Sequence, residues 1–291
     1  MPERQVVFYE CQNVEDQGDF DRVAAVAGIN DLDDEDWRVA DYDGTSEFGV
    51  IVDRVGDATK ASRLRFLRIR QDTPFVLSAA RKLTPIEVKE DERISEFTHV
   101  VMWPDGFLGA ISSRDAPSHK RLSLYFDGAA DQYAHIVNLF DPDAIKRLRE
   151  LKKYGLRNVK VKLRNSEIKQ IEDDDGVRGF SNLLKAGKGT DAITIGIELG
   201  VGRAHSLALD PELAAGAIEL AEMGDQLESM VVKGRDKNGD IQTINMKRER
   251  VSAAVEIPEA ANNARIYRAI KDARKVAEKR IGGLKRAARG S

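Results

Sequence analysis

Apolar positions in the first half of the chain occur in short runs that alternate with polar positions, a pattern typical of half-buried strands. The clearest pair of runs covers 97–103 and 107–111, separated by Pro104-Asp105-Gly106. Proline presets a turn φ, aspartate forms turns and glycine tolerates a positive φ, so this tripeptide predicts a tight hairpin. Similar runs cover 6–9, 37–42, 48–55, 64–69 and 135–140. Residues 1–140 are therefore predicted to form a strand-rich, antiparallel domain.

Helix and strand patterns alternate in the second half of the chain. Asp141-Pro142 has the residues of a helix start, and Ile145, Leu148 and Leu151 continue it as an apolar stripe. Alternating strands follow at 159–163 and 193–199, a second helix begins at Asp210-Pro211, and strands return at 229–232, 241–246 and 251–257. We therefore expect an α+β protein in which a mixed α/β domain spans residues 141–258.

The last segment, 259–291, predicts one long helix with a narrow apolar stripe. The stripe recurs at spacings of four and three residues, close to a heptad, which favours a seam with one partner helix. Its members are Ile266, Ile270, Ala273, Ala277, Ile281 and Leu284. The basic residues Arg268, Lys271, Lys275 and Lys279 lie outside the stripe. We expect the stripe to dock on an acidic surface of the same or a second copy, as the interface of a homo-oligomer.

Charge is distributed unevenly along the chain. Residues 10–60 hold fifteen acidic and four basic residues, a net charge of −11. Residues 262–291 hold ten basic and two acidic residues, a net charge of +8. Such asymmetry indicates either an anionic partner, nucleic acid or acidic protein, or complementary surfaces within one assembly.

Composition excludes several classes of protein. The single cysteine, Cys11, rules out an internal disulfide and a cysteine-based zinc cluster. No window reaches the roughly 18 consecutive apolar residues of a membrane helix, and Met1 to Glu10 have no signal pattern. These features lead us to expect a cytoplasmic protein with no membrane partner.

Basic residues on a predicted strand point to nucleic acid as a ligand. Lys160, Lys162 and Arg164 alternate with apolar residues, so they share one face of the strand at a spacing of about 6.6 Å. That spacing roughly matches successive phosphates, and the bases of the last helix would add to the attraction. Aromatic residues make up only 6% of the chain, which disfavours a platform for stacking single-stranded bases.

Candidates for catalysis are few. A nuclease of the restriction-enzyme type needs an acid near a Glu-x-Lys triplet to hold Mg²⁺ or Mn²⁺, and Asp143, Glu167 and Lys169 have a tolerable spacing. His119 lies among basic residues and is the best single candidate for a functional loop. The four histidines form no metal-binding spacing. We therefore expect no cofactor or metal unless the nuclease alternative holds, and we leave open whether the protein is an enzyme.

Several segments together resemble a loosely defined group of uncharacterised bacterial proteins that are often carried by prophages, other mobile elements or anti-phage defence loci. The resemblance covers most of residues 1–257 and rests on His99–Gly109, Leu122–Phe126, Phe140–Asp143 and Lys233–Asp240. It implies a setting in phage–host conflict but no particular activity. We thus predict a non-catalytic binding or assembly protein that holds nucleic acid by its backbone. The alternatives are a metal-dependent nuclease effector and a protein-interaction subunit such as an inhibitor, sensor or scaffold.

Overall fold

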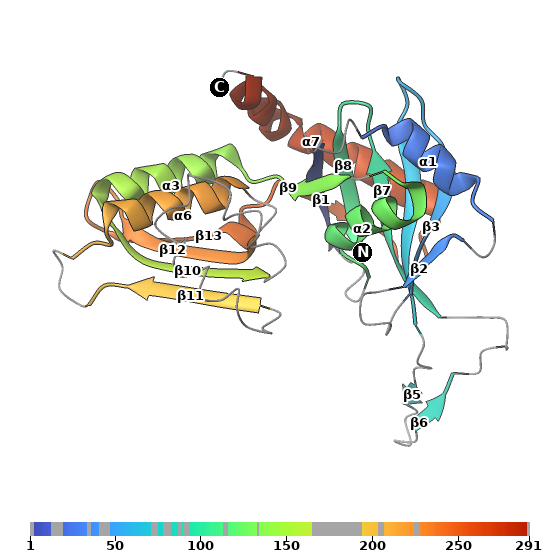
Figure 1. Cartoon of the computed structure of the whole chain (residues 1–291), viewed down its shortest axis with the longest axis horizontal. Helices are drawn as coiled ribbons and strands as arrows, with labels where there is room; N and C mark the ends of the chain where they lie inside the picture. The colour runs from blue at the N-terminus through green and yellow to red at the C-terminus, as the bar shows by residue number, and fades with distance from the viewer. Residues whose placement is uncertain are drawn as a thin grey trace. The chain divides into compact units, whose positions relative to one another are not determined.

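Strands and helices of this α+β protein gather into two compact units (Figure 1). The first unit consists of Met1–Val137 and Ser252–Ala277, and the second of Asn138–Val251 and Glu278–Ser291. The computed structural model describes residues 3–12, 20–33, 36–40, 47–70, 75–77, 83–86, 89, 94–112, 116–132, 134–164, 194–202, 207–223 and 227–289. The predicted fold class is confirmed, including the strand-rich antiparallel first part.

An eight-stranded sheet forms the centre of the first unit. Its strand order is β14-β1-β8-β7-β4-β3-β2, and β9 pairs with β1 beside this path. The strands are β1 (Glu3–Gln12), β2 (Arg38–Ala40), β3 (Glu47–Arg54), β4 (Ser62–Ile69), β7 (Ser95–Met102), β8 (Phe107–Ser112), β9 (His135–Asn138) and β14 (Ser252–Glu256). A separate antiparallel hairpin consists of β5 (Phe75–Leu77) and β6 (Leu83–Pro85).

The predicted hairpin at Pro104-Asp105-Gly106 joins β7 to β8 and is confirmed. Its turn is closed by the Trp103 amide, which donates to the Phe107 carbonyl at 2.8 Å. Gly106 has a φ of +84°, a conformation that glycine adopts without strain. Local turn chemistry was therefore enough to fix this pair of strands.

One face of the first sheet packs against α1 (Arg22–Asn30) and α2 (His119–Ala130), which lie in front of the strands in Figure 1. Alternate strand residues such as Phe66 and Val100 point to this side and are almost fully buried. They belong to one core cluster with Val26 of α1 and with Tyr125 and Phe126 of α2.

The opposite face of the sheet carries the first half of α7 (Asn263–Arg289). His99, the neighbour of Val100 on β7, contacts the Tyr267 ring at 5.3 Å between centroids. The Tyr267 hydroxyl lies 2.5 Å from Asp53 Oδ2 and 2.9 Å from the Leu64 carbonyl. Gly109 permits the close approach of α7, since a Cβ there would lie 3.1 Å from Ile270 Cγ2.

The described residues of the apolar stripe are covered within a single chain. Ile266, Ile270 and Ala273 are at most 6% exposed, and Ala277 and Ile281 are buried as well. The side chain of Leu284 lies outside the described residues. Of the two predicted alternatives, docking within the same copy accounts for this burial, and the homo-oligomer stays a prediction.

The boundaries of the two compact units also differ from the domain boundaries that the sequence predicts. β14 was grouped with the domain 141–258, but it pairs with β1 at the edge of the first sheet. The first half of the 259–291 segment is part of the first unit rather than a separate element. Both differences arise because pairing and packing connect residues that lie far apart in the sequence.

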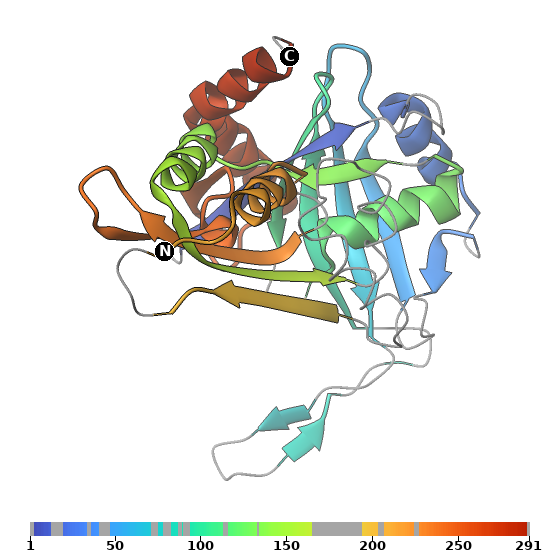
Figure 2. The ribbon, with the colours of Figure 1, turned by 60° about the vertical axis from the view of Figure 1, so that its left-hand side comes forward.

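The second unit has a four-stranded antiparallel sheet in the order β11-β10-β12-β13 (Figure 2). Two helices cover one face of this sheet, where Leu148 and Leu220 join a core with Val159 and Val232. The elements are α3 (Pro142–Tyr154), β10 (Leu156–Arg164), β11 (Thr194–Gly200), α6 (Pro211–Met223), β12 (Leu227–Arg235), β13 (Ile241–Asn245) and the short η3 (Met246–Arg248). None of the described helices has the length and apolar character needed to cross a membrane.

Candidate functional site

The sheet of the second unit has an open face that carries basic side chains. Along β10, Val159 and Val161 point to the helices, so Lys160 and Lys162 point the other way and are exposed. The antiparallel register places Lys233 of β12 directly opposite Asn158, which shares the face of Lys160. These three lysines therefore share one surface, which we call the basic sheet face.

An ion pair lies on the basic sheet face. The Glu198 carboxylate lies 3.2 Å from Lys160 Nζ. Hydrogen bonds from Lys160 and Asn158 hold the pKa of Glu198 below its usual value. Both members of the ion pair are more than half exposed, so the pair contributes little to stability and its lysine can exchange partners.

Sequence analysis identified part of this face and missed the rest. Lys160 and Lys162 were found because β10 alternates strictly, whereas the side chain of Arg164 lies outside the described residues. Lys233 on β12 was overlooked. Only the pairing of β12 with β10 shows that this lysine lies on the same face as Lys160.

The basic residues predicted on the last helix are also exposed. Arg268, Lys271 and Lys275 occupy the solvent side of α7 in the first unit, and Lys279 is exposed in the segment assigned to the second. Asp272 lies on the same side and its carboxylate accepts from Lys275 Nζ at 2.9 Å. The helix thus carries a further set of exposed basic side chains.

Of the catalytic candidates, the structure describes Asp143 and His119. Asp143 lies in the first turn of α3, where its amide donates to the Asp141 carboxylate at 3.0 Å. Glu167 and Lys169 lie outside the described residues, so the nuclease alternative stays a prediction. Within the described ranges, no three histidine, cysteine or acidic side chains gather as a metal site would require.

His119 occupies a packed position rather than an open loop. It is the first residue of α2, and its ring stacks on Tyr9 with 4.3 Å between centroids. Tyr9 is itself buried in the core under α1 and α2. The His119 ring is therefore packed against the core of the first unit, and its functional role stays a prediction.

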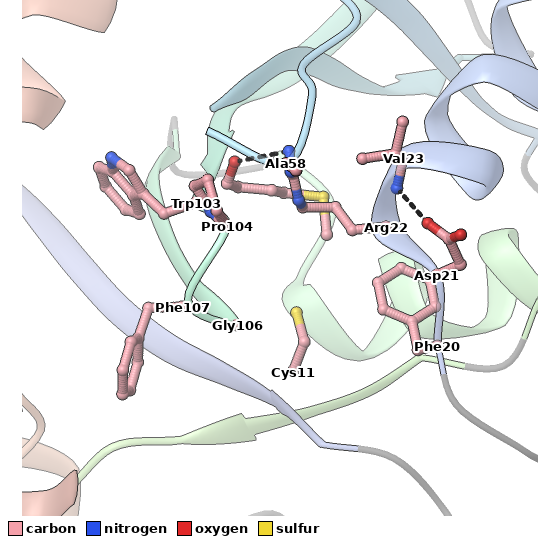
Figure 3. A pocket seen from close by; sticks show the side chains of 11 residues that line it. Cys11, Phe20, Asp21, Arg22, Val23, Ala58, Trp103, Pro104, Gly106 and Phe107 are labelled. Atoms are coloured by element: carbon pink, nitrogen blue, oxygen red, sulfur yellow. Dashed lines mark hydrogen bonds between the residues drawn. The ribbon is translucent and has the colours of Figure 1, made fainter. Parts of the chain in front are cut away.

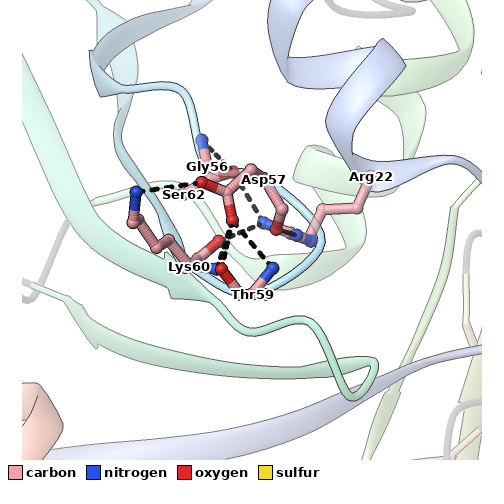
Figure 4. Close-up of polar contacts among 6 residues, drawn as sticks. All are labelled: Arg22, Gly56, Asp57, Thr59, Lys60 and Ser62. Carbon is pink, nitrogen blue, oxygen red and sulfur yellow. Dashed lines mark hydrogen bonds and ion pairs between the residues drawn. The ribbon is translucent and has the colours of Figure 1, made fainter.

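A hydrogen-bond network around Arg22 fixes the loop between β3 and β4 (Figure 4). Arg22 Nη1 donates to Ser62 Oγ at 2.9 Å, and Nη2 donates to the Asp57 carbonyl at 2.6 Å. The Asp57 carboxylate instead accepts from the amide and hydroxyl of Thr59 and from the Lys60 amide. These bonds hold the pKa of Asp57 well below its usual range.

A pocket of about 530 Å³ lies beside this network in the first unit (Figure 3). Its walls come from the end of β1, the start of α1, the Ala58 loop and the β7–β8 hairpin. Figure 3 shows the Arg22 side chain reaching from α1 towards Ala58, with Cys11 on the other side of the space. No sequence motif indicated this pocket, because its residues are distant along the chain.

Comparison with known proteins adds no family to these observations. The chain matches no protein-family model, no curated protein and no solved structure.

Proposed function

We propose that this chain is a non-catalytic binding protein that holds nucleic acid by its phosphate backbone on the basic sheet face. The observation that carries the proposal is the exposure of Lys160, Lys162 and Lys233 together on one open side of a sheet. Lysines two residues apart on a strand are separated by about 6.6 Å, so neighbouring phosphates can contact neighbouring side chains.

The chemistry of this face favours contacts to phosphates over contacts to bases. Its described residues include lysines, Asn158, Ser229 and Thr243, whose side chains can donate hydrogen bonds to phosphate oxygens. The described strands place no aromatic ring there on which a base would stack. Binding is therefore expected to be insensitive to sequence and strongly dependent on salt.

A salt titration tests the proposal. Fluorescence anisotropy with labelled duplex DNA, followed from about 50 to 200 mM salt, should give a log–log slope near −0.9 per neutralised phosphate. Replacing Lys160, Lys162 and Lys233 by glutamine should weaken binding and make the slope less steep by about 2.7. No retention of DNA or RNA even at low salt would contradict the proposal.

A matched variant distinguishes the loss of charge on the basic sheet face from a change in the net charge of the protein. Lys146, Lys152 and Lys153 are exposed on α3, on the other side of the same sheet. Replacing these three by glutamine removes the same charge and should leave the affinity nearly unchanged. Equal losses in the two triple variants would show that the sheet face is not the site.

We place this binding in phage–host conflict because of the resemblance to proteins of prophages and defence loci. Expression in a bacterial host followed by phage challenge tests that setting. The wild-type chain should change plaque formation, and the triple glutamine variant of the sheet face should not. Identical plaque counts with the wild-type chain and an empty vector would contradict the setting.

A further inference from the structure

The pocket beside Arg22 has the composition of a site for a small molecule. Its volume of about 530 Å³ lies within the range of about 300–1,000 Å³ that such sites occupy. Apolar side chains from three elements line it, namely Phe20, Val23, Met102, Trp103 and Phe107. The lining also includes the Arg22 guanidinium and the Asp21 carboxylate.

The guanidinium of Arg22 is only partly used by the protein. Its Nη1 and Nη2 atoms donate to Ser62 Oγ and to the carbonyls of Asp57, Lys60 and Met102. In the part of the chain that is described, none of these bonds uses the Nε–H. Every partner is a neutral oxygen, so no carboxylate is hydrogen-bonded to this cation.

The two nearby acids are engaged elsewhere. Asp21 Oδ1 accepts from the amides of Val23 and Ala24 at the start of α1. The Asp57 carboxylate binds Thr59 and Lys60. Burial lowers the pKa of Arg22. The negative charges of Asp21 and Asp57 act in the opposite direction, although neither carboxylate is hydrogen-bonded to the guanidinium in the described residues. A half-buried cation that faces neutral oxygens is a suitable partner for an anionic ligand.

The lining also includes the Cys11 thiol, which is unreactive at neutral pH. Burial raises the pKa of the Cys11 thiol to about 12, so the sulfur is protonated at neutral pH and is a poor nucleophile. The pocket is therefore suited to binding and not to covalent chemistry.

We infer that this pocket binds a small carboxylic acid with an apolar body. The carboxylate accepts a hydrogen bond from Arg22 Nε, and the apolar body packs against Phe20, Val23 and Trp103. The site lies in the first unit and does not depend on the basic sheet face.

Isothermal titration calorimetry with three probes tests the chemical class of the ligand. Phenylacetate should bind saturably, because it has both the carboxylate and the apolar ring. Acetate lacks the ring and should bind at least about tenfold more weakly, since burying an aromatic side group contributes about 1.5–3 kcal/mol. Phenylethylamine carries the opposite charge and should not bind. Binding of the amine but not the acid, or no saturable binding of phenylacetate, would overturn the inference.

Two tryptophan variants on the same turn of α1 complete the test. Val23→Trp places a bulky ring in the pocket and should abolish phenylacetate binding, while the Arg22 hydrogen bonds are retained. Ala24 is exposed and does not line the pocket, so Ala24→Trp should bind normally. Circular dichroism verifies that both variants are folded, and equal binding by the two would overturn the inference.

Discussion

Arg22 illustrates how one side chain connects distant parts of the first unit. It begins α1 and donates to the β3–β4 loop and to the end of β7. A guanidinium is planar and has five donors, whereas a lysine ammonium is a compact group with three. The network therefore requires the geometry of arginine as well as its charge.

Arg22→Lys is expected to destabilise the protein, because a lysine cannot reproduce the guanidinium bonds to buried Ser62 and to the Asp57 carbonyl. Ser62 keeps its bond from the Gly56 amide, so the expected cost is that of the lost hydrogen bonds, about 0.5–1.5 kcal/mol each. Chemical denaturation measures the loss, with the exposed Arg268→Lys as a control that should change stability little. Equal stability of the two variants would show that the Arg22 network is not important.

Asp57 should contribute stability that depends on pH. Its pKa is lowered in the folded protein by hydrogen bonds from Thr59 and Lys60, so the ionised form favours folding. This contribution is complete well above the unfolded pKa of about 3.9 and is lost as the pH falls further, towards the folded value. The stability difference between wild type and Asp57→Asn should therefore be constant from neutral pH to about pH 5 and shrink below about pH 4. Urea titrations across this range measure it, and a difference that grows on acidification would contradict the assignment.

Two glycines should respond oppositely to alanine. A Cβ at Gly109 would lie 2.8 Å from the Trp103 ring and 3.1 Å from Ile270, so overpacking should cost about 1–3 kcal/mol. Gly28 lies within α1 and a Cβ there would meet nothing within 4 Å, so alanine should stabilise the helix by about 0.5–1 kcal/mol. Thermal melts compare the two variants, and destabilisation by Gly28→Ala would contradict this reasoning.

At the scale of elements, α7 packs on the first sheet and should stabilise it. Ile270 is fully buried, whereas Val276, about 1.7 turns further on, is 68% exposed. Ile270→Ala should cost about 2–5 kcal/mol, and Val276→Ala should cost almost nothing. Sedimentation should show the same mass for both variants, because the stripe packs within one chain. A drop in mass for Ile270→Ala would restore the stripe as an oligomer interface.

At the scale of the whole molecule, the two units should differ in whether they can fold on their own. Among the described residues, the main core cluster of the second unit contains residues from Phe140 to Met246. The first unit needs β14 and the first half of α7, which follow the second unit in the sequence. A fragment of residues 138–251 should therefore melt cooperatively in circular dichroism, and a fragment of residues 1–137 should not. Cooperative melting of the shorter N-terminal fragment would show that β14 and α7 are dispensable.

Much of the secondary structure was determined by the sequence itself. The hairpin turn at Gly106 and the helix start at Asp141 were predictable because caps and turns depend on a few adjacent residues. The face shared by Lys160 and Lys162 was predictable for a similar reason, since a strand has a period of two. The homo-oligomer and the nucleic-acid ligand stay predictions.

Only the tertiary structure decided which elements meet. The sequence did not show that β14 pairs with β1, or that Lys233 joins the face of Lys160, because strand pairing is non-local. The apolar stripe of α7 indicated that the helix would be buried but not by what. An apolar stripe specifies a buried side, whereas its partner is chosen by the shape and spacing of the surface opposite, such as the gap at Gly109. The Arg22 pocket depends on four separate segments, and so it exists only once the chain has folded.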